Sequence, residues 1–256
     1  MIGLIIIAAI IIAALAIYLD RKRKIRNYQL PPDTHKLLSD NVAFYRDLDS
    51  KDQVLFDARV KDFLANTTIR GVDVEVEDLD RILVAAGAIM LIFSFPDWKY
   101  NNLSEVLLYK GAFDKDFKTA GAERNVLGMV GDGAMHREMI LSKPSLRASF
   151  QNPTDGHNTA IHEFAHLIDK ADGTVDGVPE YLITRPHLLP WVKEIHERIN
   201  EMKAKGHSDI NLYGATNEAE FFAVVSEYFF EQPDKLKEHH PELYGLLDEM
   251  FHPPEV

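Results

Sequence analysis

Two histidines four residues apart are the most informative chemical feature of this 256-residue sequence. His162 and His166 belong to the run His-Glu-Phe-Ala-His. On a helix, side chains four positions apart lie on the same face about one turn apart, so both rings can bind one metal ion. Neutral imidazoles suit zinc, and because the chain has no cysteine, any metal must take nitrogen and oxygen ligands. We therefore predict a zinc site with one ion per chain.

Glu163 follows the first histidine and is rotated about 100° from it around the helix axis. From there its carboxylate can approach a water that the zinc activates, and can accept the proton as this water attacks a peptide carbonyl. The pattern predicts a zinc-dependent peptidase with Glu163 as general base. The alternative is a structural helix whose two histidines are merely exposed neighbours, and such a protein would bind no stoichiometric zinc.

A catalytic zinc normally has three protein ligands and one open position. Candidates for the third ligand lie between Tyr213 and Ala223, where Glu218 and Glu220 are two residues apart and so point to nearly opposite sides of a helix. Periodicity does not choose between them. Glu218 lies toward the apolar stripe of that helix, and Glu220 could simply complete a capping box with Asn217.

Asp169 lies three residues beyond His166 and on the same helical face. Its carboxylate can accept the second ring N–H of a ligand histidine or brace a neighbouring loop, and the alternative is a pair with a nearby lysine at the helix end. Other histidines are expected on the surface or in loops, namely His157, His187, His207, His239 and His240.

Helices must position these side chains. Apolar spacing predicts helices over residues 157–171, 189–204, 217–231 and 241–251. Two further helices are expected over residues 50–65, with Ser50 and Gln53 as a capping box, and over residues 77–95. Short apolar runs at 106–109, 126–130 and 139–141, separated by Gly, Asp and Asn clusters, predict strands. Strands bracketed by helices without regular alternation indicate an α+β domain.

The N-terminal segment is apolar. Ile2 to Leu19 is an uncharged stretch of 18 residues, and basic residues follow at 21–26. Such a stretch just spans a bilayer, and a signal peptide would carry its positive charge before the apolar run. We predict a single-pass transmembrane anchor over residues 1–20, a basic flank and linker over 21–48, and a peptidase domain over 49–256. The positive-inside rule places that domain in the cytoplasm.

The chain is acidic, with 40 Asp and Glu against 28 Lys and Arg and a net charge of −12. Five of the basic residues lie in the segment 21–26, so the remainder is more acidic still. Because phosphate backbones are repelled by such a surface, nucleic acid is not expected as a partner. The expected partners are a peptide or protein substrate and, through the N-terminal helix, a membrane.

The histidine motif and its surroundings resemble the MtfA-like bacterial zinc peptidases. The resemblance is carried by residues 162–169, preceded by Asp155-Gly156-His157-Asn158 and followed by Asp172-Gly173 and Gly177-Val178-Pro179, and it covers most of residues 40–235. It implies a zincin-like metallopeptidase domain of gluzincin type, with a small sheet and an active-site helix.

The same tract is similar to the catalytic domain of anthrax lethal factor, whose pattern has a tyrosine seven residues before the third zinc ligand. Tyr213 and Glu220 have that spacing. The resemblance implies that Glu220 is the third ligand and that Tyr213 steadies the tetrahedral oxyanion. Glu218 is then a first-turn carboxylate favoured by the helix dipole.

Enterobacterial members of the MtfA-like group also bind a glucose-responsive transcriptional repressor. This property defines an alternative function, a metal-binding regulatory protein that sequesters a transcriptional regulator, with weak or incidental proteolysis. A scaffold of that kind needs neither Glu163 nor Tyr213, so the complete set favours the peptidase.

Overall fold

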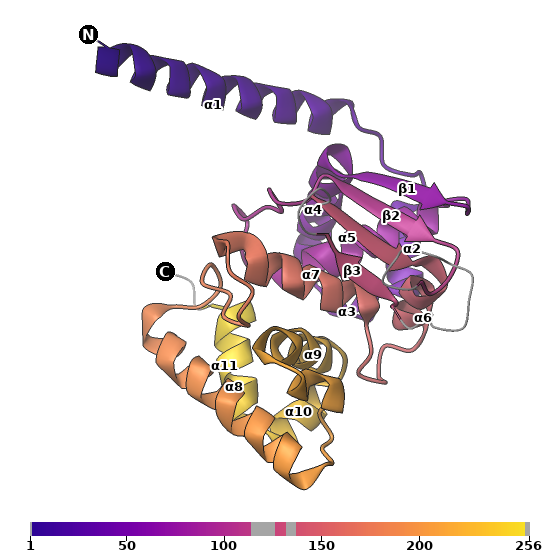
Figure 1. The fold of residues 1–256 in the computed structure, drawn as a ribbon. Coiled ribbons are helices and arrows are strands. Elements are labelled where there is room, and N and C mark those ends of the chain that lie inside the picture. Colours follow the sequence, from indigo (N-terminus) through magenta and orange to yellow (C-terminus); the bar gives the residue numbers. More distant parts are fainter. Residues whose placement is uncertain (1, 114–125, 132–136, 254–256) are drawn as a thin grey trace.

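A small sheet and the helices beside it form the body of the protein (Figure 1). The computed structural model describes residues 2–113, 126–131 and 137–253. The strands are β1 (Thr68–Val72), β2 (Glu105–Tyr109), β3 (Gly128–Val130) and β4 (Glu138–Ser142). The α-helices are α1 (Ile2–Asn27), α2 (Thr34–Asn41), α3 (Ala43–Asp47), α4 (Ser50–Asn66), α5 (Asp78–Ile92), α6 (Lys143–Gln151), α7 (Thr159–Asp169), α8 (Arg185–Lys205), α9 (Glu218–Glu231), α10 (Pro233–His239) and α11 (Pro241–Phe251). The described residues also form the 3-10 helices η2 (Lys170–Asp172) and η3 (Leu212–Ala215).

The sheet has the strand order β1-β2-β4-β3. Strands β1, β2 and β4 run parallel, and β3 pairs antiparallel with β4. Side chains alternate between the two faces, as the pleat requires. Val106, Leu108, Met139 and Leu141 are buried in the main core, while residues such as Ile140 belong to a smaller cluster. Because β3 is last in the strand order, it is an edge strand of the described sheet, and it lies close to helix α7.

Helix α5 is the central core helix, and every residue from Ile82 to Ile92 is buried. Helix α7 packs against both α5 and α9. The contact with α5 is close because α5 has Gly87 where it meets Ala160, and a Cβ at Gly87 would lie 2.7 Å from the Ala160 Cβ. This close approach positions α7 between the core and α9.

Most of the expected elements are confirmed, including the three strands at 106–141 and the helices near residues 50–65, 157–171, 217–231 and 241–251. The α+β class follows from this arrangement of helices around a small sheet. Helix α5 ends at Ile92 rather than at residue 95, and α8 begins at Arg185, four residues before the expected start.

The N-terminal cap of α4 differs from the prediction. Asp49 is the cap, since its side chain accepts hydrogen bonds from the backbone N–H groups of Lys51 and Asp52. Ser50 is therefore the first residue inside the helix rather than its cap.

Residues 34–47 were expected to be part of a linker, and this is wrong. They form α2 and α3, and Leu38, Val42 and Tyr45 are fully buried. Tyr45 also donates a hydrogen bond to Asp57 on α4, at 2.9 Å. Burial of these apolar side chains stabilises two short helices that have weak local signals.

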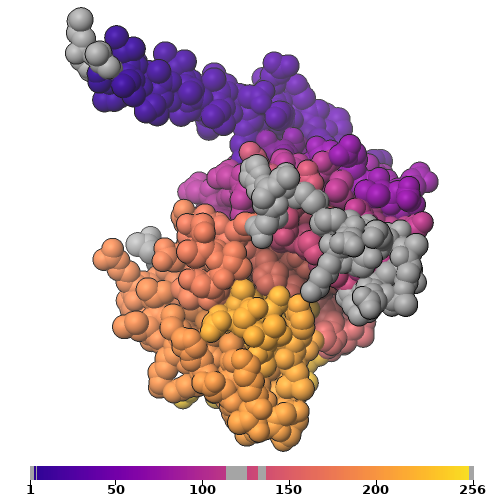
Figure 2. Space-filling model, in the orientation of Figure 1, coloured from indigo at the N-terminus to yellow at the C-terminus, as the bar shows by residue number. Residues whose placement is uncertain are grey.

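Helix α1 projects from the body of the molecule (Figure 2). Arg21 near its C-terminal end pairs with Asp62 of α4 at 2.9 Å, and apolar side chains such as Ile10 and Ile17 are exposed. Over the residues that the structure describes, no helix is both long enough and apolar enough to cross a membrane. The structure thus supports a helix at this end of the chain, and the predicted membrane-spanning segment over residues 1–20 lacks support.

Candidate metal centre

Helix α7 presents His162 and His166 on one face. The helix starts at this point because Asn158 caps it, its side chain accepting the Ile161 N–H at 3.1 Å. The two imidazole Nε2 atoms lie 3.2 Å apart, and the ring centroids are separated by 4.8 Å. The four-residue spacing therefore brings both rings to one point, as the sequence predicted.

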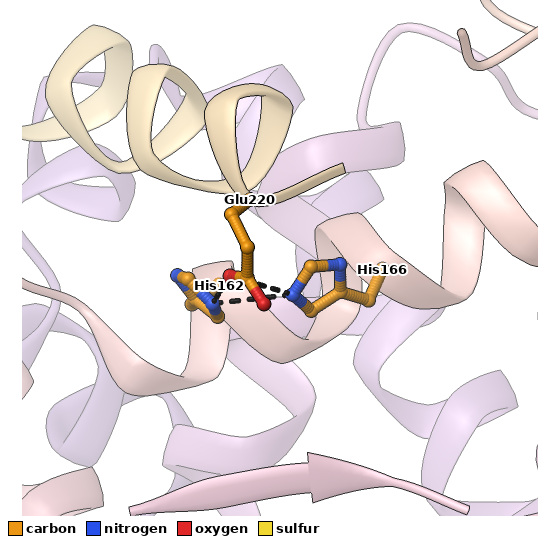
Figure 3. A group of neighbouring side chains, drawn as sticks. All are labelled: His162, His166 and Glu220. Atoms are coloured by element: carbon orange, nitrogen blue, oxygen red, sulfur yellow. Dashed lines mark hydrogen bonds and ion pairs between the residues drawn. The ribbon is translucent and has the colours of Figure 1, made fainter. Parts of the chain in front are cut away.

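Glu220 reaches the same point from helix α9 (Figure 3). One of its oxygens, Oε2, lies 3.1 Å from His162 Nε2 and 3.4 Å from His166 Nε2. The backbone N–H of Glu220 donates to the Asn217 side chain, so Asn217 caps α9 while the Glu220 carboxylate is turned toward the histidines. Glu218 takes another direction, with Oε1 at 3.5 Å from His196 Nε2 of α8.

These three side chains fit a zinc ion. One ligand atom from each of His162, His166 and Glu220 lies within 4.8 Å of the others. Zinc binds such nitrogen and oxygen atoms at about 2.0–2.2 Å, which sets tetrahedral ligand atoms roughly 3.3–3.6 Å apart. The observed separations of 3.1, 3.2 and 3.4 Å are close to that range. Two neutral imidazoles and one carboxylate also form a donor set that catalytic zinc commonly uses.

The charges around the site favour a cation. Burial lowers the pKa of His162, but its hydrogen bonds to Glu220 and Glu227 outweigh burial and raise that pKa to about 10. Burial by itself would raise the pKa of Glu220, yet the bonds to the two histidines hold it well below its usual range. A position where carboxylates hold positive charge this strongly is also favourable for a metal ion.

Glu163 lies beside the three convergent side chains and is only 6% exposed. Burial raises the pKa of its carboxyl group. Strand β3 passes directly over it, and a Cβ on Gly128 would lie 2.5 Å from the Glu163 carboxylate. Because glycine has no Cβ, the edge strand can lie directly against the Glu163 carboxylate at this position.

Tyr213 comes from η3, the turn that precedes α9. Its hydroxyl group donates to Glu220 Oε1 at 3.3 Å, and its ring centroid lies 6.0 Å from that of His162. The side chain is 54% exposed, and burial of the hydroxyl group raises its pKa. Tyr213 therefore lies at the mouth of the site with its proton retained at neutral pH.

Two cavities of about 560 and 370 Å³ meet at this point. Residues from the edge strand and from the site line both of them, namely Val126, Gly128, His162, Glu163 and Tyr213. The larger cavity also touches Val175 and Glu220, and the smaller one touches His157 and Glu227. Together they form a groove that passes across the candidate metal centre.

Asp169 is fully buried and braces a loop, one of the two roles that the sequence predicted for it. Its Oδ2 accepts the Gly177 N–H at 3.0 Å, and the Gly177 carbonyl accepts the Trp191 indole N–H at 2.8 Å. Gly177 has a φ of +73°, and a Cβ there would lie 2.3 Å from the carbonyl oxygen of Glu218. The loop thus links the end of α7 to the start of α9, the helix that carries Glu220.

The sequence interpretation missed Glu227, which is 6% exposed and lies 2.7 Å from His162 Nδ1. The spacing could have revealed it. Glu227 follows Glu220 by seven residues, which returns to the same helical face after two turns. A glutamate within the apolar run that contains Phe222 and Phe229 also needs a polar partner when it is buried.

Comparison with known proteins agrees with this geometry. A protein family described as the glucose-regulated metallo-peptidases M90 matches residues 17–252. An uncharacterized protein of Synechocystis is 29% identical over 250 residues, covering 90% of this chain and 87% of the relative. The Mlc titration factor A of Escherichia fergusonii is 29% identical over 229 residues, covering 82% of each chain. That of Pectobacterium atrosepticum is 28% identical over 183 residues, covering 64% of this chain and 66% of the relative.

Proposed function

This chain belongs to the glucose-regulated metallo-peptidases of family M90, and we propose that it is a zinc-dependent peptidase of gluzincin type with a zincin-like domain. The observation that carries the proposal is the convergence of His162, His166 and Glu220 in a groove that also contains Glu163. A site that only binds a metal ion would need no more than the three ligands. A buried carboxylate beside them, at the same wall of the groove, is what hydrolysis requires in addition.

Three side chains would hold the zinc, namely His162, His166 and Glu220. When bound, zinc would act as a Lewis acid that polarises a substrate carbonyl and lowers the pKa of water. Glu163 would accept the proton of the attacking water, and burial, which raises the pKa of its carboxyl group, makes the carboxylate a stronger base. Tyr213 keeps its hydroxyl proton and would donate it as a hydrogen bond to the oxyanion.

The groove would bind an extended peptide. It continues on both sides of the metal centre, so chain segments before and after the cleaved bond can be held at once. Edge strand β3 lines this groove, and its backbone can add hydrogen bonds to an extended substrate.

The test is Glu163→Gln in the full-length protein, because glutamine has nearly the same size and cannot take up the proton. We expect the variant to bind about one zinc per chain and to lose nearly all cleavage of a peptide library. Metal analysis and mass spectrometry of the products measure the two quantities. Comparable activity in wild type and variant would exclude Glu163 as the base, and wild-type protein without zinc would refute the proposal.

A second candidate function is the binding of a regulatory protein. Several relatives are named Mlc titration factor A, a name that describes those proteins as factors that titrate Mlc. If binding is the main function of this chain, partner binding should survive Glu163→Gln unchanged. If Glu163→Gln still binds the partner but no longer has the effect of the wild-type protein on that partner in cells, proteolysis is favoured instead.

The cytoplasmic location of the peptidase domain stays a prediction that rests on the basic residues 21–26. Protease added outside intact cells that express the full chain, and the same treatment after lysis, would test it. A domain that is protected in intact cells and digested after lysis is the expected result.

A further inference from the structure

Two glutamates of helix α9 contact opposite nitrogens of one histidine. Glu220 Oε2 lies 3.1 Å from His162 Nε2, and Glu227 Oε1 lies 2.7 Å from His162 Nδ1. Seven residues separate the glutamates, and seven residues correspond to nearly two full turns. Both carboxylates therefore project from the same face of α9, one on each side of the imidazole ring.

We infer that Glu227 is a positioning residue that holds the His162 ring with its proton on Nδ1, so that the lone pair of Nε2 faces the metal. The inference rests on the proposed zinc site. A neutral imidazole has one N–H, and an ionised carboxylate only accepts hydrogen bonds. Both ring nitrogens face a carboxylate, so with Nε2 given to the metal the one remaining N–H is on Nδ1, where it donates to Glu227. A carboxylate on the outer nitrogen also makes the ring a stronger ligand.

Glu227 is itself held in place. Its second oxygen, Oε2, accepts the backbone N–H of Asn158 at 2.6 Å, and the side chain is buried. Asn158 is the residue that caps helix α7. Glu227 therefore joins three parts of the site, which are the start of the histidine helix, the ring of His162 and the helix that carries Glu220. Rotation of the ring would break its contacts with both Glu227 and Glu220.

The two histidines differ in this respect. In the part of the chain that the structure describes, His166 has its contacts through Nε2, toward His162 and Glu220, and its Nδ1 makes no hydrogen bond. The bracing is therefore specific to the first histidine. We expect the removal of Glu227 to act on zinc through His162, with the His166 side of the site unchanged.

A purely structural role for Glu227 would predict a different outcome. In that case its bond to Asn158 stabilises the start of α7, and its loss would lower the melting temperature without a specific effect on the metal. Glu231 supplies a matched control. It lies one turn further along α9 and is 8% exposed, and among the described residues its carboxylate interacts with Asn158 and Gly156 and not with the ring of His162.

The experiment compares full-length wild type, Glu227→Gln and Glu231→Gln. Zinc affinity is measured by competition with a chromogenic chelator, and melting is measured with the metal removed. We expect Glu227→Gln to weaken zinc binding by about tenfold to hundredfold, and Glu231→Gln to stay within about twofold of wild type. In cobalt-substituted protein, Glu227→Gln should shift the visible absorption bands, and the control should leave them in place.

The outcomes separate the inference from the proposed function. Wild-type protein that binds no zinc would refute the proposed function. If wild type binds zinc tightly and Glu227→Gln matches it within about twofold, only the role of Glu227 is overturned. Should Glu227→Gln fail to fold, nitrogen-15 spectra of the zinc-loaded wild type decide the matter. A protected proton on His162 Nδ1 supports the inference, and zinc on Nδ1 overturns it.

Discussion

Helix α9 contributes to two clusters of histidine, carboxylate and tyrosine, and only one of them is shaped like a metal centre. In the first, His162, His166 and Glu220 direct their ligand atoms at one another, with Tyr213 beside them. In the second, which we call the Asp209 cluster, three side chains bond to Asp209 at 2.8 Å each, namely Tyr228, His239 and His240. Similar residue types thus form two different arrangements.

The two clusters differ in the atoms toward which their polar groups are directed. In the Asp209 cluster each donor bonds to one of the two oxygens of a single carboxylate, so the lone pairs of Asp209 are taken up by protein groups. At the candidate metal centre, the two Nε2 atoms and Oε2 face a common point at separations of 3.1–3.4 Å. Over the described residues, only the arrangement at the candidate metal centre brings three possible ligands together. Convergence of lone pairs, rather than the presence of histidine and carboxylate, distinguishes a metal site from a structural hydrogen-bond cluster.

The largest expected effect concerns zinc itself. His166→Ala removes one of three ligands, and two ligands cannot hold the ion tightly, so the purified variant should contain almost no zinc. His240→Ala changes a histidine of the Asp209 cluster and should retain about one zinc per chain. Metal analysis of both variants checks this. Zinc loss in His240→Ala would mean that the two clusters are not distinct in function.

The second effect separates the two glutamates at the start of α9. Glu220→Gln should weaken zinc binding by at least the tenfold to hundredfold that is typical even of a lost outer partner. Glu218→Gln should retain wild-type affinity, because Glu218 contacts His196 instead. Titration with a chelator measures both. If Glu218→Gln loses the metal while Glu220→Gln keeps it, the assignment of Glu220 as the third ligand is wrong.

The histidine pair could be predicted from the sequence because its geometry is local. A spacing of four residues on a helix fixes the relative position of His162 and His166 whatever the rest of the fold does. The choice between Glu218 and Glu220 is not local. It depends on how α7 and α9 pack, and this packing depends in turn on contacts such as that between Gly177 and Glu218.

Other features were missed for the same reason. Strand β1 contains Arg70 and Gly71 and has a weak strand signal, and it forms by parallel pairing with β2 more than thirty residues later. Helices α2 and α3 follow Pro31 and Pro32, which indicated a linker. The role of Glu227 depends on a contact with His162 across two helices. Non-local packing decides each of these cases, and a sequence pattern reports it only indirectly.

The tyrosines of the two clusters provide the third test. Tyr213 is 54% exposed at the groove, whereas Tyr228 is 4% exposed and bonded to Asp209. Tyr213→Phe should keep zinc and lower kcat by roughly 10²- to 10³-fold, which corresponds to the loss of the 2.7–4 kcal/mol that one oxyanion donor supplies. Tyr228→Phe should lower the melting temperature and leave kcat close to wild type. Equal kcat in wild type and Tyr213→Phe would remove Tyr213 from the mechanism.

The smallest expected effect is on stability, in the Asp209 cluster. Burial by itself would raise the pKa of Asp209, but hydrogen bonds from His240, Tyr228 and His239 outweigh it and hold that pKa well below its usual range. A carboxyl group whose pKa is lower in the folded state stabilises the fold above its unfolded pKa of about 3.9, and this contribution is lost as the pH falls further. Asp209→Asn should therefore cost about 1 kcal/mol in the free energy of unfolding at pH 7, since a charged acceptor is replaced by a neutral one.

The difference between Asp209→Asn and wild type should shrink below about pH 4, because there the unfolded wild-type chain takes up a proton on Asp209 while the folded state, with its lowered pKa, still resists it. Urea unfolding between pH 3 and pH 7 measures it, with Asp97→Asn in the exposed turn after α5 as a control that should follow wild type. Zinc content should be unchanged in both variants. A stability difference that is the same at every pH would show that the charge of Asp209 is not what holds its three partners. A loss of zinc in Asp209→Asn would connect the two clusters after all, because α9 would then transmit a change at Tyr228 to its neighbour Glu227 and so to His162.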